Sequence, residues 1–96
     1  MTVAVRIYVP ANAPPHVRAT VEQQLSMEHG GATTFEARGS WVNADDRLET
    51  DEMVVIESVA ESHDGIAERL AKYVKSQTNE DAVMWEVRPV SDMGME

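Results

Sequence analysis

The sequence predicts a single α+β domain whose elements follow the order β-α-β-β-α-β. Four segments have the character of strands, at residues 3–9, 33–42, 53–60 and 82–88; three of them divide into two faces with a period of two, and 53–60 begins with apolar residues on both faces. Two segments repeat apolar residues at helical spacing, one ending at Gly30-Gly31 and one preceding Ser76. The 96 residues fit one domain, so we expect a domain over residues 1–90 and a flexible tail over 91–96.

The first strand and the first helix have clear boundaries. In the strand, the four apolar β-branched residues fall on one face, and Pro10 ends the pairing because it has no N–H to donate. The helix begins after Pro14-Pro15, where proline is tolerated in the first turn. Its apolar stripe is Val17, Val21 and Leu25. Gly30-Gly31 ends this helix, since glycine readily adopts the left-handed capping conformation.

The next two strands are separated by an acidic segment. Thr33–Val42 alternates, and Gly39 within it suggests a bulge or a close backbone approach. We expect residues 43–51 to form an extended loop. The third strand, 53–60, begins with apolar residues on both faces, which is typical of a strand that is covered on both sides.

The second half ends with another helix and strand. Ser62 or Asp64 is suited to cap the helix, whose apolar stripe contains Ile66, Leu70 and Val74. The last strand spans 82–88 and ends at Pro89.

This order predicts an antiparallel sheet with strand order 4-1-3-2 and both helices on one face. The residues expected under the helices are Val3, Val5, Ile7, Val9, Phe35, Trp41, Val83, Trp85 and Val87. The opposite, open face would carry Arg6, Tyr8, Glu36, Arg38, Met53, Val55, Glu57, Val59, Met84, Glu86 and Arg88.

The open face is the best candidate for a functional surface. It combines an apolar patch with arginines and glutamates, and monomers rarely expose large apolar patches. Three uses remain open: a solvated face with ion pairs, a surface covered by a second subunit, or a site where arginines hold an anionic ligand. The candidate interface or ligand-binding residues are Arg6, Tyr8, Arg38, Met53, Val55, Glu57, Met84 and Arg88.

Charge and composition exclude several other classes. The net charge of −9 disfavours nucleic acid and anionic membranes as partners. The chain has no cysteine, no signal peptide and no apolar run that could span a membrane. These features predict a cytoplasmic protein that binds neither nucleic acid nor membrane.

Catalytic and cofactor motifs are absent from the sequence. We find no nucleophile elbow, phosphate loop or dinucleotide fingerprint. His16, His29 and His63 lack the spacing of a metal site, and the acidic segment 45–52 does not match a calcium-binding loop. We therefore predict no cofactor, no metal and no catalytic residue.

Two short motifs carry a family resemblance. Gly30-Gly31-Ala32-Thr33 followed by Gly39-Ser40-Trp41, after a first strand ending at Val9-Pro10, resembles a group of small uncharacterised prokaryotic and phage proteins. The resemblance implies a ferredoxin-like domain and carries no activity with it.

These observations favour a non-enzymatic, homo-oligomeric binding domain, dimeric through its open face, for a small anionic ligand or a protein. One alternative is a small dimeric α+β-barrel enzyme with a pocket between two sheets. Another is a phage or mobile-element inhibitor that acts on a host protein through its acidic surface.

Overall fold

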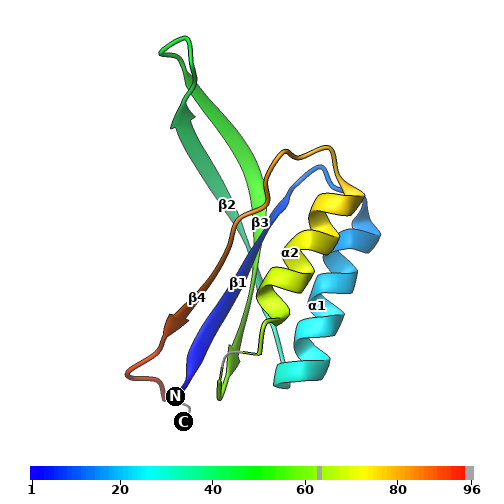
Figure 1. Ribbon diagram of the computed structural model, residues 1–96, viewed down its shortest axis with the longest axis vertical. Coiled ribbons are helices and arrows are strands. Elements are labelled where there is room, and N and C mark those ends of the chain that lie inside the picture. Colours follow the sequence, from blue (N-terminus) through cyan, green and yellow to red (C-terminus); the bar gives the residue numbers. More distant parts are fainter. Residues whose placement is uncertain (63, 95–96) are drawn as a thin grey trace.

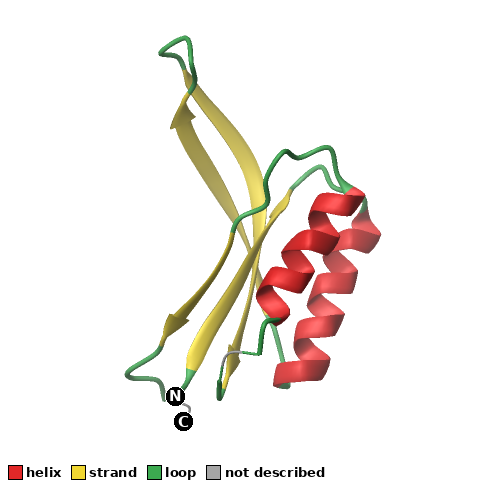
Figure 2. Ribbon diagram, in the orientation of Figure 1, coloured by secondary structure: helices red, strands yellow, loops and turns green. Residues whose placement is uncertain are grey.

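The computed structural model describes residues 1–62 and 64–94 and confirms the predicted fold class. The elements are β1 (Val3–Pro10), α1 (Pro15–His29), β2 (Thr33–Val42), β3 (Leu48–Ala60), α2 (Ile66–Gln77) and β4 (Trp85–Pro89). The sheet has the order β2-β3-β1-β4, and every neighbouring pair is antiparallel. Both helices lie on one side of it (Figures 1 and 2), which is a ferredoxin-like arrangement.

The core fills the layer between the helices and the two central strands. β1 contributes its alternate residues, and α1 and α2 contribute the stripes that their spacing predicts. The fully buried core side chains include Val5, Ile7, Val9, Val17, Val21, Leu25, Ile56, Ile66 and Val74. Burying each side chain of this size contributes about 1.5–3 kcal/mol relative to leaving it in water.

Glycines shape one end of each helix. Gly30 has φ 90°, and its N–H donates to the carbonyl of Ser26 at 2.8 Å, which ends α1 as expected. Gly65 precedes α2 with φ 81°. The carboxylate of Asp64 accepts a hydrogen bond from the N–H of Ile66 at 3.1 Å, so Asp64 satisfies a donor of the first turn of α2.

The loop between β2 and β3 is shorter than we predicted, because part of the acidic segment belongs to β3. β3 begins at Leu48, so only residues 43–47 form the turn. The side-chain oxygen of Asn43 accepts hydrogen bonds from the N–H groups of Asp45 and Arg47, at 2.8 and 3.1 Å. This capped turn allows residues 48–52 to pair with β2 despite their charge.

β2 and β3 together extend well beyond the other strands. Residues 38–42 pair with residues 48–52, and beyond Met53 the only further backbone hydrogen bond to this described segment from outside it runs from the Ala11 N–H to the Glu52 carbonyl, at 3.2 Å. We call residues 38–52 the hairpin arm; Figure 1 shows it projecting away from the helices. The radius of gyration is 14.2 Å, compared with about 12.5 Å for a compact chain of this length.

The faces of β2 are the reverse of our prediction. The register places Phe35 opposite Val55 and Trp41 opposite Glu49, so both aromatic residues lie on the open face. Glu36 and Arg38 lie on the helix side instead. The physical reason is that α1 lies over β3 and α2 over β1 and β4, leaving most of the edge strand β2 uncovered. Its apolar side therefore had no helix to pack against.

The last strand is shorter than predicted. β4 covers Trp85–Pro89, although the carbonyl of Met84 still accepts a hydrogen bond from the N–H of Tyr8 at 3.0 Å. Trp85 lies on the helix side as expected. Of the predicted tail, residues 91–94 have no helix or strand, and 95–96 lie outside the described residues, as does His63. None of the helices is long and apolar enough to cross a membrane, within residues 1–62 and 64–94.

Candidate functional site: the open face of the sheet and the pocket at its end

The open face is the side of the sheet opposite the helices, and a charged network occupies its centre. Arg6 on β1 forms ion pairs with Glu57 on β3 and with Glu86 on β4, the latter at 3.5 Å. The hydroxyl of Tyr8 donates to Glu86 at 2.9 Å. The hydrogen bond to Glu57 raises the pKa of Arg6 above its ordinary value, so Arg6 remains a cation that two carboxylates neutralise.

Apolar side chains surround this network. The guanidinium of Arg6 lies 5.7 Å from the centre of the Phe35 ring, within the range of a cation–π contact. The exposed or half-buried apolar residues of the open face are Tyr8, Phe35, Trp41, Met53, Val59 and Met84. Val55 differs from them because its neighbours within the chain already cover it, and it is only 1% exposed.

Met53 packs closely against β2. A Cβ built on Gly39 would lie 2.7 Å from the Met53 methyl group, so this glycine leaves room for the side chain. We expected a bulge or a close backbone approach at Gly39; the structure shows neither, because the pairing of β2 with β3 continues without a bulge and the atom close to Gly39 belongs to the Met53 side chain.

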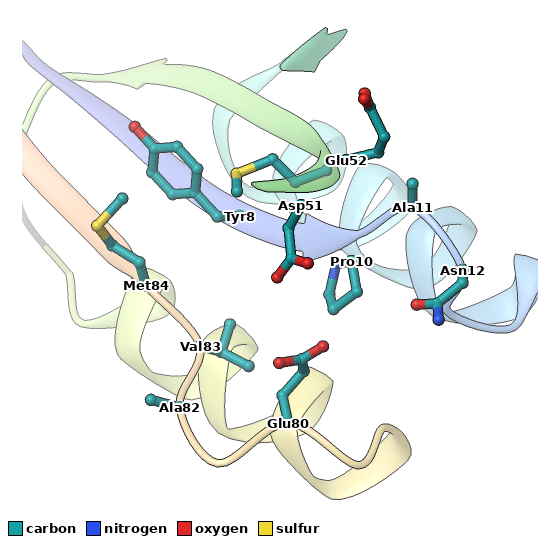
Figure 3. A pocket seen from close by; sticks show the side chains of 11 residues that line it. Tyr8, Pro10, Ala11, Asn12, Asp51, Glu52, Glu80, Ala82, Val83 and Met84 are labelled. Carbon is teal, nitrogen blue, oxygen red and sulfur yellow. The ribbon is translucent and has the colours of Figure 1, made fainter. Parts of the chain in front are cut away.

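A pocket of about 370 Å³ opens at one end of this face (Figure 3). Three segments come together there: the end of β1, residues 51–53 at the base of the hairpin arm, and the connection from α2 to β4. The lining residues are Tyr8, Pro10, Ala11, Asn12, Asp51, Glu52, Met53, Glu80, Ala82, Val83 and Met84. Three of them are acidic and none is basic, so the pocket is negatively charged.

The structure separates the three arginines that we had placed together. Arg6 and Arg88 both lie on the open face, where Arg88 is an exposed residue of β4 opposite Ala4. Arg38 lies on the other side of the hairpin arm and pairs with Glu52 at 3.0 Å. The remaining predicted site residues, Tyr8, Met53, Val55, Glu57 and Met84, do share the open face.

One polar cluster on the helix side was not predicted from the sequence. Nδ1 of His29 lies 2.6 Å from the Ser58 hydroxyl, and Nε2 lies 3.1 Å from the Asp64 carboxylate. The three residues come from the end of α1, the C-terminal end of β3 and the segment before α2. No sequence motif could have revealed them, because 29 and 35 positions separate His29 from its two partners.

This cluster connects elements and is unsuited to nucleophilic catalysis. Ser58 is buried in the sheet opposite Val5, so no substrate reaches its hydroxyl. Desolvation favours a higher pKa for Asp64, but hydrogen bonds from the Ile66 N–H and from His29 outweigh it and hold that pKa below its ordinary value. Asp64 is therefore a carboxylate at neutral pH that orients the His29 ring.

Metal-ligating side chains do not converge in the part of the chain that the structure describes. There, no group of three or more histidine, aspartate or glutamate residues is placed to hold a metal ion.

Comparison with known proteins places the chain by its fold alone. No family model matches the chain, and neither does any curated protein. Solved structures do match it over nearly its whole length, and they share its ferredoxin-like arrangement.

Three of these structures illustrate the likeness. GlnK of Bacillus subtilis, solved as an ATP complex, has a TM-score of 0.68 and 19% identity over 94% of this chain and 82% of that chain. The divalent cation tolerance protein CutA1 of Thermus thermophilus has a TM-score of 0.66 and 15% identity, over 98% and 88%. A NIF3-related protein of Bacillus cereus has a TM-score of 0.64 and 21% identity over 95% of this chain, which spans only 26% of that protein.

Proposed function

We propose that the protein is a non-enzymatic, homo-oligomeric binding domain whose copies meet through the open face. The observation that supports this proposal most directly is the reversed orientation of β2, which adds Phe35 and Trp41 to the apolar residues of that face. Large exposed apolar patches on small proteins mark interaction surfaces. At the centre of the face, Arg6 already has both of its carboxylate partners within one chain, so covering this network leaves no guanidinium without a partner.

The hairpin arm supports the same proposal. Val42 and Leu48, a directly paired couple near its turn, are exposed on the side opposite Trp41. An isolated two-stranded hairpin is marginally stable in water, so apolar side chains on both sides of the arm favour its burial against another copy. A two-fold dimer is the simplest oligomer that would cover the open face together with the side of the arm that carries Trp41.

A second copy suits the open face better than a small anion does. Arg6 is neutralised by two glutamates, and Arg38 lies on the other side of the arm. Arg88, the third candidate arginine, is exposed on the edge strand β4. Nucleotide binding, which the name of the GlnK–ATP complex suggests for that protein, is disfavoured in the pocket because acidic residues line it. The lack of cysteine suits the reducing cytoplasm, where we propose that the protein acts.

The test is the molar mass by light scattering over a concentration series. We expect the wild type to run at two or more times the chain mass of 10.6 kDa. Met84 lies on the open face and is 59% exposed, so Met84→Glu would place a charge in the interface. We expect this variant to stay folded and its molar mass to fall to 10.6 kDa. Val55→Glu is a poorer choice, because Val55 is buried within its own chain.

Met27→Glu is the matched control. Met27 lies on α1, away from the open face, and is 73% exposed. This variant introduces the same change of side chain and charge, and it should keep the wild-type mass. A wild type that remains at 10.6 kDa at high concentration would contradict the proposal, as would equal dissociation of both variants.

A further inference from the structure

The pocket at the end of the open face has the size of a small-molecule site. Its volume of about 370 Å³ lies within the range of roughly 300–1,000 Å³ that is usual for ligand pockets. All of its lining residues belong to one chain, so the pocket is complete in the monomer. Tyr8, Met53 and Met84 also belong to the proposed interface, so a ligand and a second copy would compete for these side chains. Segments from three separate parts of the sequence form it, and Figure 3 shows them enclosing a common space.

One part of the pocket is apolar. The Tyr8 ring, Met53 and Met84 line it on the open face, and Pro10 and Val83 continue the wall. The hydrogen bond from the Tyr8 hydroxyl to Glu86 fixes the ring, with the hydroxyl directed away from the pocket in Figure 3. A flat apolar group fits such a wall, because aromatic rings and methionine sulfur make favourable contacts with each other.

The other part of the pocket is acidic. In Figure 3 the carboxylates of Asp51 and Glu80 point into the same space from opposite sides. Neither carboxylate forms an ion pair or hydrogen bond with any residue in 1–62 or 64–94. Glu52, the third acidic lining residue, is directed away from the pocket and pairs with Arg38. Asp51 and Glu80 therefore provide two negative charges that no cation of the chain's described part balances.

We propose that this pocket binds a small organic cation, with an ammonium group between Asp51 and Glu80 and a flat apolar body against Tyr8, Met53 and Met84. A compact metal ion would leave the apolar wall unused, and two carboxylates provide fewer oxygen ligands than calcium takes. An anion would meet two carboxylates without a counter-charge. The net charge of −9 also concentrates cations near the surface.

The experiment titrates the purified protein with phenethylammonium and follows backbone amide shifts and the heat of binding. Two probes dissect the chemistry: ethylammonium keeps the charge without the ring, and phenylacetate keeps the ring with the opposite charge. We expect phenethylammonium to bind at least about tenfold more tightly than either probe, because ethylammonium lacks the contacts of the ring and phenylacetate lacks the positive charge. Perturbed amides should cluster at residues 8–12, 51–53 and 80–84.

Two variants assign the charge to the pocket. Asp51→Asn with Glu80→Gln should weaken phenethylammonium binding by about tenfold or more, since both charges are lost and the side-chain shapes are kept. Glu61→Gln removes a charge from an exposed glutamate outside the pocket and should change binding by less than about twofold. Equal weakening by both changes would show a general charge effect and overturn the proposal.

Other outcomes would also overturn it. These are binding of phenylacetate as tight as that of phenethylammonium, saturable binding of magnesium that displaces phenethylammonium, and the absence of any shift at the pocket amides. Because the molar mass is measured on the same samples, failure of this site is distinguishable from failure of the oligomer.

Discussion

His29 connects three separate parts of this fold through its side chain. The side chain lies at the end of α1, is 4% exposed, and bridges the Ser58 hydroxyl on β3 and the Asp64 carboxylate just before α2. Ser58 is also the one buried polar residue of the described core. A buried hydroxyl without a partner costs free energy, so the bridge keeps a polar group from destabilising the sheet.

Replacing this ring should destabilise the protein measurably. His29→Ala leaves the Ser58 hydroxyl buried without its partner, and we expect the free energy of unfolding in urea to fall by about 1–3 kcal/mol. Ser58→Ala combined with His29→Ala should recover part of that loss, because the stranded hydroxyl is gone. Equal stability of His29→Ala and the wild type would contradict a structural role for the bridge.

At the level of elements, β2 shows what periodicity determines and what it leaves open. The alternation over 33–42 correctly predicts a strand and correctly divides its residues into two sets. Which set faces the helices depends on the partner strand: Thr34 pairs with Ile56, whose side chain is in the core, and its hydroxyl donates to Glu22 on α1. Sequence spacing contains no information about that register.

The start of β3 shows a second limit. Charged residues over 49–52 lower the tendency to form a strand in the interior of a sheet, so their sequence favours a loop. In the hairpin arm both faces are open, and these side chains remain in water while the backbone pairs with β2. The sequence therefore underestimates the length of a strand that extends away from the core.

Trp85 on β4 gives a quantitative check of how far the helices cover the sheet. The residue lies on the helix side opposite Ile7 but is 38% exposed. A fully buried tryptophan costs about 3–5 kcal/mol when it is replaced by alanine, so we expect Trp85→Ala to cost about 1–3 kcal/mol in urea unfolding. A loss above about 4 kcal/mol would mean that α2 covers this side chain more fully than the structure shows.

On the scale of the whole molecule, charge opposes the association that the apolar surfaces favour. Each copy carries a net charge of −9, so two copies repel each other over the distance at which salt does not screen them. That distance is about 30 Å at 0.01 M salt and about 8 Å at 0.15 M. Apolar contacts are not weakened by this screening.

Self-association should therefore strengthen as salt is added. Between 10 mM and 300 mM sodium chloride we expect the dissociation constant of the oligomer to fall by roughly threefold or more, measured by sedimentation equilibrium. Met84→Glu should remain a monomer at both concentrations. An oligomer that dissociates as salt rises would contradict an apolar interface and indicate one held by ion pairs.

The candidate site was predictable in part for the same reasons as the fold. Alternation predicts which residues of β1, β3 and the last strand share a face, because both other strands pair directly with β1. The residues placed correctly in this way include Arg6, Tyr8, Met53 and Met84. The pocket was not predictable, since it depends on where Glu80, in a connection without regular structure, meets Asp51 of the hairpin arm. Contacts of that kind depend on tertiary geometry and leave no periodic signal in the sequence.

The central position of β1 has a consequence for how the chain folds during synthesis. Of the six elements of this domain β1 is made first, yet Val3 pairs with Ala60 on one side and with Pro89 on the other. Its apolar residues must therefore stay unpaired until β3, and then β4, have left the ribosome. Such distant pairings slow folding because the loops between them must close first. Helix α1, which needs only local hydrogen bonds, is the element best able to shield β1 during that interval.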